Sequence, residues 1–315
     1  MTAILLAISG WDERPWLDRF RALLPGREIV TPETIGERGE VAYALSWRHP
    51  AGSLAGLPNL KAIFSLGAGV DHMFHDPQLP DVPIVRVVDA DLRDRMSEWV
   101  VLHALIHHRQ QRLYDWRQDH GIWEEDVDQP AAADVRVGIM GLGVLGADAA
   151  VKLAAVGFDV AGWSRTPRTL EGVACFHGAD GLEAMLARTD ILVALLPLTP
   201  QTRGMLNARL FAKLARDGRL GGPILLNAGR GGLQVEADIL AALDGGVLKA
   251  ASLDVFEVEP LPKTSPLWRH PRVTISPHNA AISAPDAILR YVVGEIGAFE
   301  RGGRLNNVVD RARGY

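Results

Sequence analysis

The sequence predicts an α/β protein of two domains, each built around a parallel β-sheet. Short apolar runs alternate with helical patterns along the chain, which is typical of parallel sheets with crossover helices. One of these runs leads directly into a glycine-rich turn and then into a helical pattern. The chain has 315 residues, which is enough for two domains of ordinary size with a core in each.

The N-terminal part contains four predicted strands and two helical patterns. The strands are expected at residues 3–8, 41–45, 60–66 and 83–88. The first helix is expected over residues 11–24, where Pro25-Gly26 ends it. A second, unusually long helical pattern runs from Asp91 to about His120. An acidic, proline-containing loop follows it over residues 124–134.

The glycine-rich turn is the most specific motif of the chain. A strand over residues 135–140 leads into Gly141-Leu142-Gly143-Val144-Leu145-Gly146, and a helical pattern follows over residues 147–156. Gly141 allows the tight turn, Gly143 lets the backbone approach a pyrophosphate, and Gly146 lets the helix pack closely on the strand. The helix N-terminus adds free N–H groups and the positive end of a dipole. With a second strand over residues 158–163, the motif predicts a dinucleotide-binding, doubly wound (Rossmann-like) sheet for a nicotinamide or flavin dinucleotide.

Five more strands and a last helix complete the larger half of the chain. The strands are expected at residues 173–176, 190–195, 223–227, 250–253 and 273–276, and an amphipathic helix at 285–300. The simplest division into domains is 1–130 and 131–315. The alternative is a discontinuous first domain, to which the last helix returns. In both divisions a ligand cleft is expected between the domains, at the carboxyl ends of the strands.

The bulk composition excludes several classes of protein. Hydrophobic residues make up 48% of the chain and charged residues 23%, which argues against disorder. A net charge of −5 and a pI near 6.1 give no support for a partner nucleic acid or membrane surface. The single cysteine, Cys175, excludes an intramolecular disulfide and a cysteine-based zinc cluster. No run approaches the roughly 20 apolar residues of a membrane span, and the first residues are interpreted as a strand and not as an export signal. A cytoplasmic enzyme is expected.

Three polar residues follow predicted strands of the larger half. Arg230 follows the strand at 223–227, Glu259 the strand at 250–253, and His278 the strand at 273–276. An arginine fork suits a carboxylate, and a carboxylate beside an imidazole favours the protonated ring, which can exchange a proton with a carbonyl oxygen. Each residue alone would more often be a surface, capping or structural residue. Together, on a domain that binds a hydride carrier, they predict an oxidoreductase active site.

At these residues the chain resembles the D-isomer-specific 2-hydroxyacid dehydrogenases, over essentially its whole length. The segments that carry the resemblance are Gly141–Gly146, Leu195–Thr199, Asn227–Gly231, Leu253–Pro260 and Pro266–His278. Within the family the chain is similar to the A-type glyoxylate/hydroxypyruvate reductases. The features that mark this subgroup are Trp163-Ser164-Arg165-Thr166, the stretch from Pro266 to His278 and the closing residues 310–315.

The resemblance implies a role for each of these residues. Arg230 would bind the carboxylate of a small 2-keto acid and polarise its carbonyl, His278 would be the acid/base, and Glu259 would hold His278 and favour its charged form. Asp254 would lie beside the nicotinamide. The other cofactor contacts implied by the resemblance are Gly141, Gly143, Val144, Leu145, Gly146, Ser164, Arg165, Thr166, Leu196, Pro197, Ala228 and Gly229.

The resemblance also implies the arrangement of the domains. A discontinuous, flavodoxin-like substrate-binding domain would comprise residues 1–97 plus 286–315, and residues 98–285 would form the NAD(P)-binding Rossmann domain, with hinges near Met96 and Pro285. A homodimer built largely through the cofactor domain is implied as well.

In the implied substrate-binding domain, a glycine loop and a tryptophan would contact the substrate. Backbone N–H groups of Leu66 and Gly67 would receive the substrate carboxylate, and Trp47 would line the pocket. The usual neighbour of that tryptophan is a histidine. Here Arg48 interrupts the pattern, so the contacts of this loop stay open.

The end of the second strand of the dinucleotide unit distinguishes the two nicotinamide cofactors. NAD-binding units place an Asp or Glu there to bind the ribose hydroxyls. This chain has Ser164, followed by Arg165, Thr166 and Arg168, which can accept a 2′-phosphate through charge-assisted hydrogen bonds. NADP(H) is therefore the preferred cofactor expected, with NAD(H) as the other candidate, and the expected direction is reduction of the keto acid.

Two other functions stay open. One is an NAD-linked dehydrogenase of another D-2-hydroxy acid, against which the absent acidic ribose ligand counts. The other is a dinucleotide-sensing binding protein, since the related transcriptional corepressors keep the three catalytic residues. A metal site at His103, His107 and His108 is not expected, because no carboxylate accompanies these histidines, and packing or interface roles are expected instead.

Overall fold

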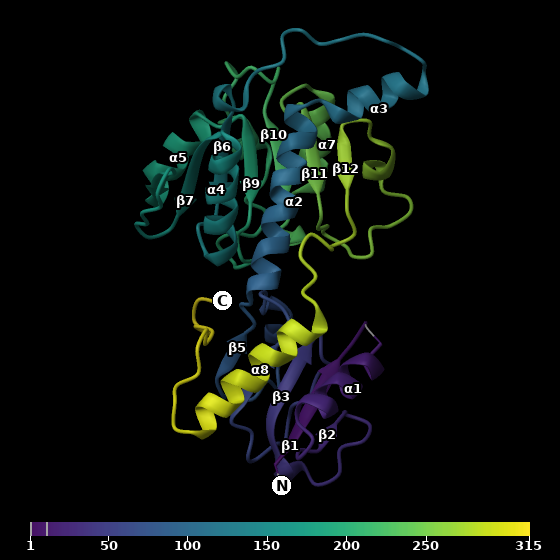
Figure 1. The fold of residues 1–315 in the computed structure, drawn as a ribbon, viewed down its shortest axis with the longest axis vertical. Coiled ribbons are helices and arrows are strands. Elements are labelled where there is room, and N and C mark those ends of the chain that lie inside the picture. The colour runs from purple at the N-terminus through teal and green to yellow at the C-terminus, as the bar shows by residue number, and fades with distance from the viewer. Residues whose placement is uncertain (1, 11) are drawn as a thin grey trace. The chain divides into compact units, whose positions relative to one another are not determined.

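The computed structural model describes residues 2–10 and 12–315, which form two compact units (Figure 1). Unit 1 comprises Met1–Leu92 and Ser283–Tyr315, and unit 2 comprises Arg93–Ile282. Both boundaries lie a few residues before those that the resemblance implies. The first boundary falls inside helix α2 (Ala90–His108), so one continuous helix carries the chain from unit 1 into unit 2.

Unit 1 is a five-stranded, wholly parallel sheet in the order β2-β1-β3-β4-β5. This is the flavodoxin-like strand order. The strands are β1 (Ala3–Ile8), β2 (Ile29–Val30), β3 (Val41–Trp47), β4 (Ala62–Ser65) and β5 (Ile84–Arg86). Helices α1 (Arg14–Leu23) and α8 (Pro285–Glu300) pack together on one face, where Phe20 and Leu289 are fully buried. The apolar stripe of α8 therefore completes the core of a sheet whose last strand ends at Arg86, far earlier in the chain.

Unit 2 is a seven-stranded parallel sheet in the order β12-β11-β10-β9-β6-β7-β8 (Figure 1). The strands are β6 (Arg136–Met140), β7 (Asp159–Ser164), β8 (Ala174–His177), β9 (Ile191–Ala194), β10 (Ile224–Asn227), β11 (Ala250–Leu253) and β12 (Val273–Ile275). The chain leaves β6 toward β7 and β8 and then returns to place β9 on the other side of β6. This reversal is the switch point at which doubly wound sheets bind ligands. The predicted α/β class with parallel sheets is confirmed.

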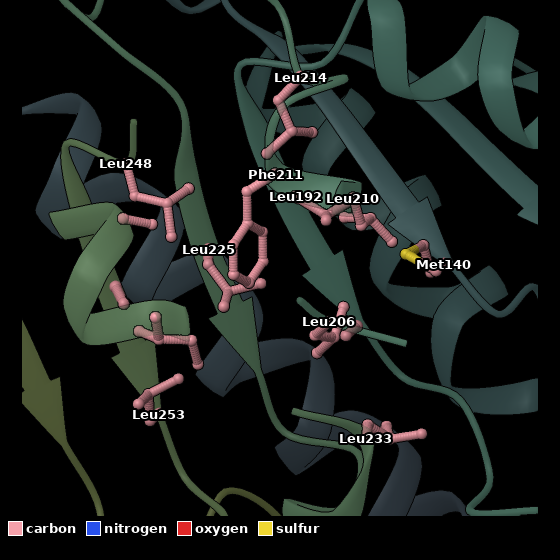
Figure 2. Close-up of a cluster of buried hydrophobic side chains, with 14 of the residues drawn as sticks. Met140, Leu192, Leu206, Leu210, Phe211, Leu214, Leu225, Leu233, Leu248 and Leu253 are labelled. Carbon is pink, nitrogen blue, oxygen red and sulfur yellow. The ribbon is translucent and has the colours of Figure 1, made fainter. Parts of the chain in front are cut away.

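Helices cover both faces of the second sheet. One face is covered by α2 and α4 (Val144–Val156), through residues such as Val100 and Leu153. The other face is covered by α5 (Gly178–Ala187), α6 (Ala208–Phe211) and α7 (Glu236–Asp244). Figure 2 shows this second layer, in which the Phe211 ring packs among leucines of β9, β10 and α6. Both layers are apolar because successive strand residues point to opposite faces and the sheet is buried on each.

The long helical pattern predicted from Asp91 to about His120 was wrong as a single helix. The structure has α2, ending at His108, and a separate α3 (Gln111–Asp119). Gln110 between them is left-handed, with φ at 53°. Its side chain donates to Asp126 of the acidic loop, and the Gln129 side chain donates to the carbonyl of His108, 3.3 Å away. These contacts with the acidic loop stabilise the interruption between α2 and α3. Helical periodicity in the sequence gives no information on such contacts.

Several short elements were given no bounds in the prediction. The helices α5, α6 and α7 are among the crossover helices expected only in general terms, whereas the two-residue strand β2 and the short 3-10 helices of the described residues were not expected. Within residues 2–10 and 12–315, no helix has both the length and the apolar character needed to cross a membrane.

Candidate active site

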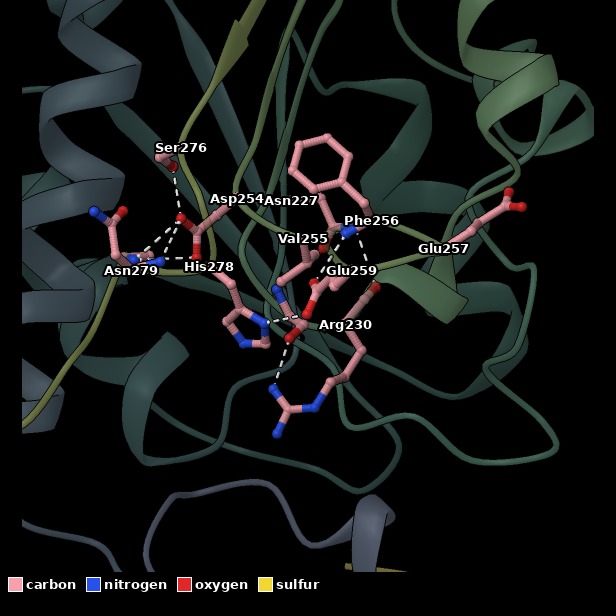
Figure 3. Close-up of polar contacts among 12 residues, drawn as sticks. Asn227, Arg230, Asp254, Val255, Phe256, Glu257, Glu259, Ser276, His278 and Asn279 are labelled. Atoms are coloured by element: carbon pink, nitrogen blue, oxygen red, sulfur yellow. Dashed lines mark hydrogen bonds and ion pairs between the residues drawn. The ribbon is translucent and has the colours of Figure 1, made fainter. Parts of the chain in front are cut away.

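Three neighbouring strands of unit 2 bring the predicted trio together. Because β10, β11 and β12 are adjacent and parallel, their carboxyl ends share one edge of the sheet. Arg230 follows β10, Glu259 follows β11 and His278 follows β12. In Figure 3 the guanidinium of Arg230 and the imidazole of His278 extend to the same side, with the Glu259 carboxylate beside the imidazole.

Glu259 and His278 form a direct hydrogen-bonded pair. Nδ1 of His278 lies 2.8 Å from Oε2 of Glu259, and the other carboxylate oxygen accepts the Phe256 N–H at 3.1 Å. An ionised carboxylate is only an acceptor, so the Nδ1 atom of His278 carries the proton of this bond. The Nε2 atom is then the ring nitrogen left to act on a substrate. The side chains are 32% exposed at His278 and 19% at Glu259, so a small molecule can reach the imidazole.

The turn that carries Arg230 is shaped by close backbone packing. The Asn227 side chain is buried, accepts the Gly229 N–H and donates to Gln234 at 2.8 Å. A Cβ at Gly231 would lie 1.7 Å from the Phe256 carbonyl oxygen, so only glycine allows this approach. The half-buried Arg230 donates from Nη1 to the Gly229 carbonyl at 2.8 Å. Its planar guanidinium has the donor geometry that matches a planar anion.

Asp254 lies in the same region but its carboxylate serves the backbone of the His278 turn. It is 1% exposed and accepts hydrogen bonds from the hydroxyl of Ser276 and from the N–H groups of Asn279 and Ala280. The resemblance implied that Asp254 lies beside the nicotinamide. The geometry shows a carboxylate that binds the backbone of the turn after His278 (Figure 3).

The dinucleotide turn sits at the switch point between β6 and β9. Gly141 has φ at 107° and a Cβ there would lie 2.7 Å from the Leu195 carbonyl oxygen. A Cβ at Gly146 would lie 1.9 Å from the Gly141 carbonyl oxygen, whereas a Cβ at Gly143 would have no atom of the described residues within 4 Å. Gly143 is the N-cap of α4, and among the described residues no side chain caps the helix. Open space over uncapped N–H groups fits the pyrophosphate of a dinucleotide.

The remaining predicted cofactor residues follow β6, β9, β10 and β7. Val144 and Leu145 form the first turn of α4, Leu196-Pro197 follow β9, and Ala228-Gly229 follow β10. These residues thus line the carboxyl edge on both sides of the switch point.

The end of β7 carries hydroxyl and guanidinium groups. Ser164 is its last residue, and its hydroxyl donates to the Thr166 carbonyl at 2.7 Å. Arg165, Thr166 and Arg168 are exposed. No carboxylate stands at the strand end, where a ribose-binding acid would be placed.

In unit 1, only one of the two backbone N–H groups predicted to bind the substrate carboxylate lacks a short hydrogen bond within the described residues. The Leu66 N–H donates to the Ser46 carbonyl at 3.0 Å and the residue is 1% exposed, so the expectation that this amide receives a carboxylate is wrong. The sheet takes up the amide, because β4 continues its ladder with β3 past its last residue. Among the described residues, the Gly67 N–H makes only a long contact of 3.4 Å, with the Ser65 hydroxyl. Trp47 packs directly on Gly67, where a Cβ would lie 2.6 Å from its ring.

Arg48 interrupts the expected pattern by turning the chain. Its φ is 46°, and its guanidinium lies 6.0 Å from the centroid of the Trp47 ring. The next residue, His49, is buried, with Nδ1 2.7 Å from the Ser46 hydroxyl and Nε2 3.2 Å from Asp76. The arginine therefore takes the place beside Trp47, and the histidine belongs to the interior of unit 1.

Several known proteins are similar to this chain. Residues 101–280 match the D-isomer specific 2-hydroxyacid dehydrogenase, NAD binding domain. A glyoxylate/hydroxypyruvate reductase A of Yersinia enterocolitica is 39% identical over 311 residues, which are 97% of each chain. The crystal structure of an NADPH-dependent glyoxylate/hydroxypyruvate reductase from Sinorhizobium meliloti, in complex with NADP and sulfate, is 50% identical, with a TM-score of 0.93 over 100% of both chains.

A third similar protein is a probable 2-hydroxyacid dehydrogenase from Rhizobium etli, solved in complex with NADP, HEPES and L(+)-tartaric acid. It is 48% identical, with a TM-score of 0.93 over 100% of this chain and 99% of its own. The chain belongs to the D-isomer-specific 2-hydroxyacid dehydrogenase family. The predicted family is confirmed, and with it the prediction of an enzyme of this class.

Sequence reasoning about this 2-hydroxyacid dehydrogenase missed the residues that contact the turn of His278 without belonging to the trio. Ser276, in the loop before His278, binds Asp254, and Trp99 of α2 donates from Nε1 to the Ser276 hydroxyl at 3.0 Å. His103 and His107, for which packing or interface roles were expected, both contact the hydroxyl of Ser252, at 2.9 and 2.8 Å. The one available signal was the one-turn spacing of the two histidines, which marks a common face of the helix but not its partner.

Proposed function

We propose that the protein is an NADPH-dependent reductase that converts glyoxylate or hydroxypyruvate into glycolate or D-glycerate. The observation that carries the proposal is the 2.8 Å bond between His278 and Glu259, at the strand ends where Arg230 also lies. The reductases of Yersinia enterocolitica and Sinorhizobium meliloti support the choice of substrates, because they share 39% and 50% of their residues with this chain.

The three side chains divide the chemistry among themselves. The Arg230 fork holds the carboxylate of the keto acid and draws electron density from the neighbouring carbonyl. The Nε2 atom of protonated His278 gives its proton to the carbonyl oxygen as that oxygen gains charge. Glu259 orients the ring through Nδ1 and stabilises its positive charge before the transfer. Bound NADPH would supply the hydride that the carbonyl carbon accepts.

The proposed cofactor residues are those of the dinucleotide turn and the end of β7. The N–H groups at the start of α4, after Gly143, would face the pyrophosphate. Ser164, Arg165 and Thr166 would hold the 2′-phosphate, since a hydroxyl and a guanidinium bind a phosphate that a carboxylate would repel. NADP in the Sinorhizobium meliloti and Rhizobium etli structures supports this choice. Gly67 and Trp47 of unit 1 are the proposed further contacts of the substrate.

The test is a set of initial rates with NADPH and NADH on glyoxylate, hydroxypyruvate and pyruvate. We expect fast turnover with NADPH and at least one of the first two substrates, and loss of about 10³-fold or more in His278→Ala. Tight NADPH binding without turnover of any keto acid would overturn the reductase and favour a binding protein. Faster turnover with NADH would favour the NAD-linked dehydrogenase.

We also propose a homodimer in the cytoplasm. Exposed apolar side chains of α2, α3 and the loop after α3 support an interface on unit 2: Leu102, Leu113, Trp116, Ile122 and Trp123. Light scattering of the purified protein should give twice the mass of 34.2 kDa, and a monomeric mass would contradict the dimer.

The proposed compartment, the cytoplasm, is a reducing one. A single cysteine, Cys175, is consistent with such a compartment, which cell fractionation would test.

A further inference from the structure

We propose that Trp99 and Ser276 are positioning residues for His278, and that they act through the buried carboxylate of Asp254. The inference rests on the proposed acid/base role of His278. It adds a function for helix α2, which contributes no residue to the trio itself.

His278 needs support because its backbone is strained. Its φ is 52°, in the left-handed region that a residue with a large side chain rarely adopts. The turn persists because its three successive N–H groups are all bound: His278 donates to the Asp254 carbonyl at 2.7 Å, and Asn279 and Ala280 donate to the Asp254 carboxylate at 3.0 and 3.1 Å. A change at Asp254 therefore moves the backbone from which the imidazole reaches Glu259.

The direction of the hydrogen bonds can be derived from the groups themselves. An ionised carboxylate only accepts, so the Ser276 hydroxyl donates its one proton to Asp254, at 2.6 Å. The same oxygen can then only accept from Trp99, whose Nε1 is a pure donor, at 3.0 Å. The chain from Trp99 through Ser276 to Asp254 thus has a single arrangement, and a buried carboxylate that loses one donor must find another or move.

Trp99 is itself fixed at two points. It is 7% exposed, and its ring lies 4.0 Å from the ring of His103, centroid to centroid. His103 contacts the hydroxyl of Ser252 on β11, two residues before Asp254. The helix α2 is therefore joined both to the strand that leads to Asp254 and to the loop that leads to His278. A rigid helix holds a catalytic group more accurately than a loop alone.

The first test compares Trp99→Phe with Trp268→Phe. The first variant keeps an aromatic ring beside His103 and removes the N–H donor together with part of the indole ring. The second removes an equivalent donor, which binds the Pro262 carbonyl at 3.0 Å outside this chain of contacts. We expect kcat to fall about ten- to hundredfold in Trp99→Phe, because small misplacements of a reacting group have effects of this size, with KM for the keto acid within about twofold. Trp268→Phe should keep the wild-type kcat.

Ser276→Ala and Ser276→Thr give a second pair, should Trp99→Phe fold poorly. The alanine variant should lose activity as Trp99→Phe does, and the threonine variant, which keeps the hydroxyl, should recover most of it. Equal kcat in all four variants and the wild type would overturn the inference, and so would a loss in Trp99→Phe that Trp268→Phe shares.

A spectroscopic readout separates this inference from the proposed function. The Nδ1 proton of His278, bound to Glu259, should give a downfield proton resonance, assigned by its absence in His278→Gln. We expect that resonance to broaden or disappear in Trp99→Phe and to persist in Trp268→Phe, even if the wild type reduces none of the keto acids. A resonance that stays unchanged in Trp99→Phe would overturn the positioning role, whatever the activity shows.

Discussion

Two glycines of the dinucleotide turn must be small for different reasons, and substitution separates them. Alanine at Gly143 meets open space, so Gly143→Ala should keep the midpoint of thermal unfolding of the wild type. It should weaken NADPH binding at least about tenfold, or about 1.4 kcal/mol, because a methyl group then stands where the backbone meets the pyrophosphate. Fluorescence titration with NADPH measures the affinity. Undiminished binding would exclude this turn as the cofactor site.

Gly146→Ala is the matched variant at the same turn. Its methyl group would lie 1.9 Å from the Gly141 carbonyl oxygen, so the helix must move away from the strand. We expect a loss of about 1–3 kcal/mol in the free energy of unfolding, as for other overpacked sites. Urea unfolding of the two variants side by side should show the loss in Gly146→Ala alone.

The Arg230 side chain should act through its planar fork and not only through its charge. Arg230→Lys keeps the positive charge but loses the paired donors that match a carboxylate. We expect kcat/KM for glyoxylate to fall about 10²-fold or more, while the NADPH affinity stays constant. Arg209→Lys, at an exposed position of α6, is the control and should leave kcat/KM unchanged. Retained activity in Arg230→Lys would show that the charge suffices.

The strands that carry the candidate site residues were predicted more fully than the hydrogen bonds that support those residues. Each of Arg230, Glu259 and His278 lies in the loop after a strand, and strand ends can be located from a short apolar run and the turn after it. That these strands are neighbours, in the order β10-β11-β12, is a property of the sheet, which residue patterns do not contain. Asp254, which binds the turn after His278, is itself bound by Ser276 of the same loop. Ser276 in turn is bound by Trp99, which is 177 residues away in sequence. Helical periodicity marks an apolar face and gives no information on which loop it meets.

The two central strands β6 and β9 are joined at their amino ends by a buried ion pair. Arg136 at the start of β6 binds both oxygens of Asp190 at 3.0 and 2.8 Å, and Asp190 is 2% exposed. Arg136 also binds Asp217, at 2.7 Å, whose side chain is 79% exposed. Asp190→Ala should lower the free energy of unfolding by about 3 kcal/mol, because a half-buried guanidinium loses its buried partner and keeps only the exposed one.

The exposed partner of the same guanidinium supplies the control. Asp217→Ala removes a pair that water screens, and the expected loss is below about 1 kcal/mol. Urea unfolding followed by circular dichroism gives both values. Equal losses in the two variants would mean that burial does not decide the strength of this pair.

At the scale of the whole molecule, residue patterns alone could not predict where the chain passes from one unit to the other. The last helix, α8, has an evident apolar stripe, but a stripe predicts only that some surface is covered. Its partners Trp16, Leu17 and Phe20 belong to α1, far earlier in the sequence. Likewise, α2 is one continuous helix across the boundary between the units, so no break in pattern marks the place where unit 1 ends.

The stability of the folded protein should fall as the pH drops below about 6.5, because of two histidines on α2. Burial lowers the pKa of His103 to about 4, and burial lowers the pKa of His107 to about 3, with the positive charges of His103, Arg112 and Lys249 adding to the effect. Both rings are therefore neutral in the folded protein near pH 7, and a nitrogen of each contacts the Ser252 hydroxyl. The unfolded chain takes up protons at these two side chains from about pH 6.5 downward, whereas the folded chain does so only near their lowered pKa values.

The contribution of this pair is therefore complete above pH 6.5 and decreases as the pH falls toward 4. For each of the two histidines, the free energy of unfolding falls by up to about 1.4 kcal/mol per pH unit in this window, as long as the ring stays neutral in the folded protein. Urea unfolding between pH 7.5 and about pH 4.5 measures the slope. His103→Asn with His107→Gln places an amide near each bonded ring nitrogen and should flatten the slope, because neither amide takes up a proton. His120→Gln, at an exposed site on the surface of the molecule, should leave it unchanged. A slope that persists in the double variant would assign the acid sensitivity to other groups.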